Sequence, residues 1–349
     1  MARLAFIIGG TGQIGRKIAE TLLARGWTVT LSHRGERPVP ADLLRLGANF
    51  AAFDRHEEGA LSRALRGGAD AVIDTIAYTP EHANQLAGIS RNVGNITVIS
   101  SASVYQDDKG RTLDEAGVGG FPDFPGPIKE TQRTVPPGPQ TYSTLKAALE
   151  QRLLEKSKSP VTILRPCAIY GPHSRHPREY WFVKRMLDQR PVIPLAFRGE
   201  SRFHTSAVEN IAALTLLSLE KPGTRVFNTA DPESLTLVQI GAAIARQMHF
   251  KGRFHLIDND EYPPTSGSTP WSVPAPFTLD MTAALAFGYQ PVTAYEEAVG
   301  AVCKWLVESS PKDWRAAFPD LASYPNDQFD YEAEDVFLSS LSSQKDQRN

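Results

Sequence analysis

The stretch "IIGGTGQIGRKI" (residues 7–18) decides the fold, because it joins a buried-strand pattern to a helix pattern through spaced glycines. The apolar run "LAFII" is typical of a buried strand, and "IGRKIAETLLARG" has helical spacing that ends at Gly26. Glycine at such a junction lets the backbone turn tightly and lets a pyrophosphate approach the N–H groups at the positive end of the helix. The pattern predicts a dinucleotide site, with contacts from Gly9, Thr11, Gly12, Gln13, Ile14 and Gly15.

Strand and helix patterns alternate outward from this stretch. The strand-like runs "WTVTLS", "DAVIDTIAY", "ITVISSASVY" and "VTILRPCAIYGP" are separated by segments with helical spacing. Such alternation implies a parallel sheet with helices on both faces. We therefore predict an α/β protein, a Rossmann doubly wound parallel sheet with a smaller, interleaved C-terminal substrate domain.

Three regions are expected along the chain. Residues 1–170 form an NAD(P)-binding Rossmann domain, in which the Pro-, Gly- and Asp-rich segment 106–140 is a candidate lid loop. Residues 171–308 form mainly a substrate-binding domain, with segments that return to the Rossmann domain. Residues 309–349 form an acidic C-terminal extension, and its end "SSLSSQKDQRN" is expected to fray.

The composition excludes several classes of partner. A net charge of −2 over 349 residues gives no global footprint for nucleic acid or for an acidic membrane. No apolar segment approaches the roughly 20 residues that span a bilayer, and the N-terminus lacks a signal-peptide pattern. Cys167 and Cys303 are far apart, and His173, His176 and His204 lack metal-like spacing, so no metal is expected. We expect a cytoplasmic protein without nucleic-acid or membrane partners.

The end of the second predicted strand bears on the choice of cofactor. An acid there would accept hydrogen bonds from the adenosine ribose and repel a 2′-phosphate. This chain has donors and a positive charge instead, at Ser32, His33 and Arg34, and these suit the phosphate of NADP. In the alternative, Arg34 is a solvated turn residue, Glu36 reaches the ribose, and NAD binds. Asp54, which ends the third strand, is placed either to meet the adenine or to cap a helix.

A tyrosine–lysine pair is the candidate acid/base. Tyrosine has a pKa near 10, a cation favours its phenolate, and a lysine four residues later on a helix lies on the same face. The spacing occurs three times: "YQDDK" (105–109) is expected in a loop, and "YWFVK" (180–184) is expected to cover an apolar patch of the smaller domain. Only "YSTLK" opens a helix between the fifth and sixth strands, where it can flank a nicotinamide. We therefore predict Tyr142 and Lys146.

Other polar and aromatic residues are candidates for substrate contacts. The strand end "VISSASVY" supplies serines, of which Ser101 is expected to orient the reacting oxygen, although serines there also form turns. Tyr78 and Tyr105 could stack on a ring or simply pack. Arg202 belongs to a basic segment after Gly171 that indicates an anionic substrate or a solvated face. The substrate candidates are Tyr78, Ser103, Tyr105 and Arg202.

In combination and order, six motifs make the chain resemble the extended short-chain dehydrogenase/reductase family, the NAD(P)-dependent epimerases and dehydratases, from residue 1 to about 308. The motifs are "GGTGQIG", "DTIAY", "SSASVY", "YSTLK", "LRPCAIYGP" and "FGYQP". The resemblance implies a catalytic set of Ser101, Tyr142 and Lys146. It also implies that Ala77 lies by the cofactor ribose, that Pro166 and Cys167 lie near the nicotinamide, and that helices around 81–93 and 141–156 form a homodimer.

Two departures from the family pattern bear on the substrate. Nucleotide-sugar members usually carry Asn where this chain has Ala168, and their His-Val-Asp-Asp-like motif is here "AVEN" (207–210). The expected function is an epimerase/dehydratase-type oxidoreductase that acts on a sugar or nucleotide-sugar hydroxyl by Tyr-assisted hydride transfer. The alternatives are an NADPH-dependent reductase of a small carbonyl compound and a non-catalytic NADP-binding or RNA-associated protein.

Overall fold

A computed structural model describes residues 2–34, 39–52, 54–65, 67–258, 266–309 and 311–346. The chain divides into two compact units, each described here by itself. The first, which we call the sheet unit, comprises Met1–Ile169, Ser206–Pro232 and Leu279–Thr293. The second, the helical unit, comprises Tyr170–Thr205, Glu233–Thr278 and Ala294–Asn349.

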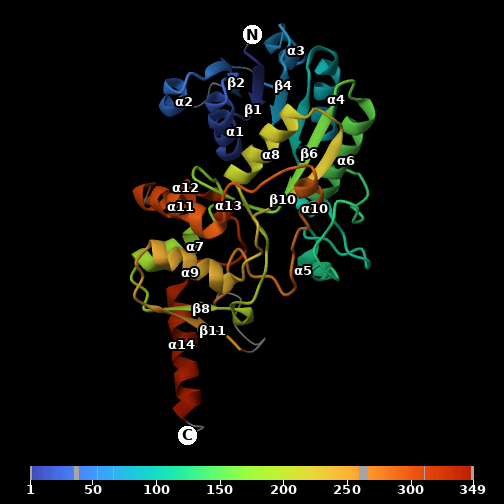
Figure 1. Cartoon of the computed structure of the whole chain (residues 1–349). Coiled ribbons are helices and arrows are strands. Elements are labelled where there is room, and N and C mark those ends of the chain that lie inside the picture. Colours follow the sequence, from blue (N-terminus) through green and yellow to red (C-terminus); the bar gives the residue numbers. More distant parts are fainter. Residues whose placement is uncertain are drawn as a thin grey trace. The chain divides into compact units, whose positions relative to one another are not determined.

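The sheet unit is built on a seven-stranded parallel sheet in the order β10-β6-β5-β4-β1-β2-β3 (Figure 1). The strands run outward in both directions from β1, which confirms the predicted Rossmann doubly wound sheet. The strands are β1 (Leu4–Ile8), β2 (Thr28–His33), β3 (Asn49–Ala52), β4 (Ala71–Asp74), β5 (Ile96–Ile99), β6 (Val161–Pro166) and β10 (Arg225–Thr229).

Helices cover both faces of this sheet. On one face α1 packs against α8, and on the other α4 packs against α6. Strand β1 shows why: Phe6 and Ile8 join the core under α4 and α6, whereas Ala5 and Ile7 join the core under α1 and α8. Alternate side chains of a strand point to opposite faces, so an unbroken apolar run needs cover on both. The helices are α1 (Gln13–Ala24), α2 (Ala41–Arg45), α3 (Ala60–Ala64), α4 (Pro80–Ile89), α5 (Ala116–Gly119), α6 (Tyr142–Lys156), α8 (Val208–Glu220) and α10 (Thr282–Ala286), with short 3₁₀ turns η1 (Ser90–Asn92) and η2 (Ala102–Val104).

The segment 106–140 belongs to the sheet unit and is organised around one buried carboxylate. Asp107 accepts hydrogen bonds from the backbone N–H groups of Lys109, Arg111 and Asp123, and from the Arg111 side chain at 2.6 Å. Its role as a lid stays a prediction.

The helical unit packs α7, α9 and α11 together beside a parallel pair of strands, β8 and β11. A second pair, β7 (Ala168–Tyr170) and β9 (Thr205–Ala207), occurs where the chain leaves and re-enters the sheet unit. In the described part of the chain, no helix is long and apolar enough to cross a bilayer. The elements are α7 (Tyr180–Leu187), β8 (Val192–Leu195), η3 (Phe197–Gly199), α9 (Leu237–Gln247), β11 (Arg253–Leu256), α11 (Tyr295–Ser309), α12 (Trp314–Ala317), α13 (Pro319–Ala322) and α14 (Tyr331–Asp346).

The acidic extension is anchored to α7 at the start of α14. Arg185, 1% exposed, donates to Oε2 of Glu334 at 3.0 and 3.2 Å, and Tyr331 donates to Asp188 at 2.6 Å. Arg190 binds the next acid, Asp335. The helix that begins at these contacts continues through Asp346, across much of the stretch that was expected to fray.

Candidate active site

The glycine turn between β1 and α1 has three crowded glycines, Gly9, Gly10 and Gly15, and one open glycine, Gly12. Gly9 has φ 77°, and a Cβ there would lie 2.5 Å from Oγ1 of Thr75. A Cβ on Gly15 would lie 2.5 Å from the Gly9 carbonyl oxygen, so Gly15 serves close packing of helix and turn. Gly12 is exposed and is the N-cap of α1, where no side chain caps the helix. The N-terminus of a helix favours an anion, and this one follows a glycine turn as a pyrophosphate site of a dinucleotide does.

The remaining predicted contacts of this turn, Thr11, Gln13 and Ile14, are partly exposed beside it. Ser32 does not present its hydroxyl as expected. It is buried, and its Oγ accepts a hydrogen bond from the Gly9 N–H at 3.4 Å, so it supports the turn. Arg34 is exposed, while the His33 side chain and Glu36 lie outside the described residues. Asp54 accepts from the His56 N–H at 2.9 Å in a local turn, and the N-cap of the following helix, α3, is Gly59.

Lys146 lies buried at the carboxyl edge of the sheet. Its Nζ donates to the Ala77 carbonyl at 2.7 Å, just beyond β4, and to the Ile99 carbonyl at 3.0 Å, where β5 ends. Burial lowers the pKa of Lys146 to about 8, although the charges of Asp74 and Glu150 favour its ammonium form. The structure thus places the predicted lysine at the edge where ligands of this fold class bind.

Tyr142 begins α6 and stands one helical turn before Lys146. Its ring lies 5.4 Å from the ring of Tyr78. Desolvation raises the pKa of Tyr142 to about 12, and its interaction with the Ser101 side chain opposes this rise. We expected Lys146 to lower this pKa. In this geometry it does not, because Nζ is engaged by two carbonyls and lies 5.7 Å from the ring centroid.

The three strand-end serines have separate environments. Ser101 is the N-cap of η2 and accepts from the Ser103 N–H at 3.1 Å while it also contacts Tyr142. Ser100 instead donates to a carboxylate oxygen of Glu150. The Ser103 hydroxyl is buried without a hydrogen-bond partner among the described residues. Of the three serines, Ser101 is therefore the one whose side chain influences the pKa of Tyr142.

Tyr105 is not brought to this group. It is fully buried, its hydroxyl donates to Oδ1 of Asn228 at 2.6 Å, and it accepts from Nη1 of Arg165 at 3.1 Å. A hydroxyl satisfied in this way inside the core has no free face for a substrate. Tyr105 therefore packs in the core, as the second of its two predicted roles had it, and does not line a substrate site.

The remaining residues of the predicted nicotinamide region follow β6. Pro166 ends the strand and is buried, and Cys167 is partly exposed with its N–H bonded to Oγ of Ser206 at 3.0 Å. Ala77 is buried and contributes the carbonyl that holds Lys146.

Sequence reasoning missed a set of buried charges around Lys146. Arg165 donates to both carboxylate oxygens of Glu150, with Nη2 2.5 Å from Oε2. Arg55 pairs with Asp74, which is fully buried at the end of β4, with 3.0 Å between Nη2 and Oδ2. One signal was present: "VTILRP" has a charged residue in a buried apolar strand, and a buried charge needs a partner.

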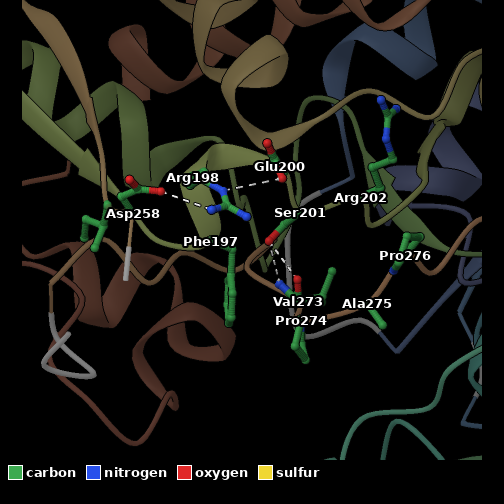
Figure 2. Close-up of a pocket in the computed structure, with 11 residues that line it drawn as sticks. Phe197, Arg198, Glu200, Ser201, Arg202, Asp258, Val273, Pro274, Ala275 and Pro276 are labelled. Atoms are coloured by element: carbon green, nitrogen blue, oxygen red, sulfur yellow. Dashed lines mark hydrogen bonds and ion pairs between the residues drawn. The ribbon is translucent and has the colours of Figure 1, made fainter. Parts of the chain in front are cut away.

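The helical unit has a cavity of about 720 Å³, lined by η3 and by residues 200–202, 257–258 and 273–276 (Figure 2). Figure 2 shows Arg198 between Asp258, at 3.1 Å, and Glu200, at 3.8 Å. Arg202, a predicted substrate residue, also lines this cavity, and its guanidinium donates to the Ser234 carbonyl.

Much of the basic segment after Gly171 is paired with acids. The pairs are Arg175–Asp320, Lys184–Asp188, Arg185–Glu334, Arg190–Asp335 and Arg198–Asp258. Several of these acids come from the C-terminal extension. The surplus of positive charge that indicated an anionic substrate is therefore largely neutralised within the helical unit.

Comparisons with known proteins agree with this architecture. A family model described as "NAD dependent epimerase/dehydratase family" matches residues 5–230. The chain is 28% identical over 254 residues to the chloroplast stem-loop binding protein of 41 kDa b from Arabidopsis thaliana, and the match covers 69% of this chain and 62% of that protein. It thus spans less than two thirds of that relative's length.

Among solved structures, UDP-N-acetylglucosamine 4-epimerase from Methanobrevibacter ruminantium has a TM-score of 0.66 at 18% identity, covering 88% of this chain and 99% of that one. UDP-glucose 4-epimerase from Thermus thermophilus, solved with NAD, has a TM-score of 0.65 at 19% identity, covering 87% and 99%. At these identities the likeness shows the fold.

Proposed function

The chain belongs to the NAD dependent epimerase/dehydratase family, and from this premise we propose that it is an oxidoreductase that acts on a sugar or nucleotide-sugar hydroxyl. The observation that carries the proposal is the group formed by Ser101, Tyr142 and Lys146 at the carboxyl edge of the sheet. That edge also holds the N-terminus of α1. A nucleotide bound at the turn and a substrate at Tyr142 would then share one edge.

A nicotinamide nucleotide would supply the hydride acceptor or donor. The N–H groups after Gly12 would hold its pyrophosphate, and Lys146 would hold its ribose. Arg34 is the exposed cation at the end of β2 and would favour the 2′-phosphate of NADP, whereas Ser32 is turned inward. We therefore propose NADP or NAD, with Arg34 as the residue that decides between them.

Tyr142 would be the proton carrier. With a pKa of about 12 its phenol is protonated, so Oη is ready to donate a proton to a carbonyl oxygen. In the reverse direction Oη would take the proton of an alcohol, and Lys146 would favour the phenolate that this step needs only if Nζ left its two carbonyl acceptors for the phenol. Ser101 would donate a hydrogen bond to the same substrate oxygen and fix its position.

The substrate class is proposed from the structural relatives and from the cavity in the helical unit. Two of those relatives are named as 4-epimerases of UDP-sugars. The cavity has the volume of a small-molecule site, and Arg202 is the cation on its lining suited to an anionic group, since Arg198 is already paired with Asp258 and Glu200. Ala168 and the "AVEN" sequence at 207–210 are the departures that could select an atypical sugar.

Two other functions have support of their own. An NADPH-dependent reductase of a small carbonyl compound would use Tyr142 in the protonated state found here. Stem-loop binding, in the RNA-associated class, is favoured by the name of the Arabidopsis relative. Denaturing the purified protein and identifying the nucleotide it releases separates these hypotheses. Stoichiometric NAD(P)⁺ favours a redox-neutral epimerase or dehydratase, and an empty site that prefers NADPH favours the reductase.

The test of the catalytic group is Tyr142→Phe, assayed with a panel of UDP-sugars. Loss of the phenol hydroxyl removes the proton carrier, so turnover should fall about 10²–10⁴-fold while nucleotide binding survives. Tyr180→Phe is the matched control, because Tyr180 has the same spacing to Lys184 but begins α7 in the helical unit. Equal turnover by Tyr142→Phe and the native protein would contradict the assignment.

A further inference from the structure

We propose that Glu150 is a positioning residue that fixes both Ser101 and Lys146 through its hydrogen bond with Ser100. The inference rests on the proposed function, since it concerns the same catalytic group. Ser100 is the residue between two contacts of that group: the carbonyl of Ile99 accepts a hydrogen bond from Nζ of Lys146, and the side chain of Ser101 interacts with Tyr142 and lowers its pKa. A shift of Ser100 would therefore move both contacts.

The bond between Ser100 and Glu150 is fully enclosed. Ser100 is 3% exposed and Glu150 is 4% exposed, and Oγ of Ser100 donates to Oε1 of Glu150. A charged acceptor in a water-poor interior makes a strong and directional hydrogen bond. The end of β5 is thus tied to the middle of α6 at the residue that precedes Ser101.

Glu150 is itself held on its other side. Nε of Arg165 lies 3.1 and 3.2 Å from its two oxygens, and Nη1 of the same guanidinium donates to the Tyr105 hydroxyl at 3.1 Å. Tyr105 in turn bonds Asn228 on β10, and Asn228 donates to the Ile128 carbonyl at 2.8 Å. The carboxylate therefore cannot follow Ser100 if Ser100 moves.

The charge of Glu150 also acts on Lys146 directly. The two residues are four apart on α6 and lie on one face of the helix. The charged groups that favour the ammonium form are Glu150 from α6 and Asp74 from β4, and Asp74 is already paired with Arg55. Removal of the Glu150 charge should make the ammonium form of Lys146 less stable.

A buried ion pair that serves only folding does not need a serine donor such as Ser100. Glu334 and Arg185 in the helical unit are as deeply buried, and the second oxygen of Glu334 meets a further arginine, Arg190, at 3.4 Å. In the sheet unit the corresponding oxygen of Glu150 is also bonded by the residue that adjoins the catalytic serine. This difference assigns Glu150 a role in positioning beyond folding.

The first test needs no substrate. The pKa of Lys146 is measured by ¹³C NMR of labelled lysine side chains, with Lys146→Arg used to assign the signal. We expect Ser100→Ala and Glu150→Gln each to lower this pKa, and the matched control Glu334→Gln to leave it at the native value. Ser100→Ala keeps the Glu150–Arg165 pair, so it remains informative if Glu150→Gln folds poorly. A native Lys146 titration in both Ser100→Ala and Glu150→Gln would overturn the inference.

The second test uses whichever UDP-sugar the native protein converts. Misplacement of the catalytic group by a fraction of an ångström to about 1 Å should lower kcat about 10–100-fold in Ser100→Ala with little change in KM. A native kcat in Ser100→Ala would also overturn the inference. If the native protein converts none of the sugars, that result counts against the proposed function, and the Lys146 titration alone decides the role of Glu150.

Discussion

The two buried glutamate–arginine pairs have the same chemistry but opposite electrostatic balance. In the sheet unit, burial alone would lower the pKa of Arg165, but the hydrogen bonds and charge of Glu150 outweigh it and raise the pKa. In the helical unit, burial lowers the pKa of Arg185 despite the charge of Glu334. Glu150 uses both oxygens on its arginine, whereas Glu334 offers Arg185 only Oε2.

The two pairs differ in what their glutamates contact. Two-point contact and a serine donor hold Glu150 in one orientation, which supports the proposed positioning role. Glu334 instead joins two arginines of one segment to the start of α14, so it anchors the C-terminal extension. A buried pair is weak evidence for net stability, but loss of one partner is costly because the other charge stays buried.

The largest expected effect comes from removing one acid of each pair. Glu334→Ala should lower the free energy of unfolding by about 3–5 kcal/mol, because Arg185 would stay buried against the Trp181 ring, 3.5 Å from its guanidinium carbon. Glu150→Ala should cost a similar amount, because each arginine stays buried with only neutral acceptors: Arg165 keeps the Tyr105 hydroxyl, and Arg185 keeps the Trp181 and Gln328 carbonyls. Urea unfolding of both variants measures the two losses.

Asp335→Ala is the control for this comparison. Asp335 also binds an arginine, Arg190, but its side chain is 60% exposed, so its removal should change the unfolding free energy by less than about 1 kcal/mol. A loss in Glu334→Ala no larger than that in Asp335→Ala would show that burial does not set the cost.

The second prediction concerns the pH dependence of stability, to which the sheet unit should contribute through Lys146. Lys146 has a pKa of about 8 in the folded protein against 10.5 for the free side chain, so between these values the unfolded chain binds more protons. The stability of the native protein relative to Lys146→Met should therefore rise from pH 8 toward pH 10.5, by about 1–3 kcal/mol. Urea unfolding at pH 7 and pH 10 measures this.

Glu334→Gln is the control, because it removes a buried charge of the helical unit and leaves Lys146 and its hydrogen-bond partners in place. Its stability difference from the native protein should be the same at both pH values. If the difference in unfolding free energy between the native protein and Lys146→Met is also the same at both pH values, the lowered pKa of the buried Lys146 is contradicted.

The smallest expected effect compares two aspartates at helix starts. Asp114 accepts the Ser143 N–H at 2.7 Å at the start of α6, and Asp313 accepts the Arg315 N–H at 3.0 Å at the start of α12. Replacement of either by Ala should cost about 1 kcal/mol. Only Asp114→Ala should also lower the pKa of Tyr142, because the Asp114 charge raises it. Ultraviolet titration of the phenol, with Tyr142→Phe as reference, tests this, and an identical titration in both Asp variants would refute the link.

Periodicity explains how much of the fold was predictable. Apolar runs, helical spacing and the glycine turn are local features, so the doubly wound sheet follows from them. The helix that begins at Tyr142 and carries Lys146 was placed for the same reason. The order of the strands and the return of β10 to the sheet depend on contacts between distant segments.

The buried polar contacts around Lys146 were missed because they too join segments that are distant in the sequence. Ser100 and Glu150 are 50 residues apart, and Tyr105 and Asn228 are 123 apart. A polar residue in an apolar stretch indicates that a partner exists, but no local pattern identifies the partner. The acidic extension was unexplained because its acids match arginines of α7 and the following turn, which are about 145 residues earlier.

The anchor of α14 has a consequence for the order in which the protein is made. Arg165 follows Glu150 by 15 residues, so at about 5–20 residues per second a ribosome completes that pair within about 1–3 s. Glu334 follows Arg185 by 149 residues, so α7 emerges about 7–30 s before its acid exists. During that interval the nascent helical unit carries Arg185 without its acid, whereas the Arg165–Glu150 ion pair beside the proposed catalytic group can already form.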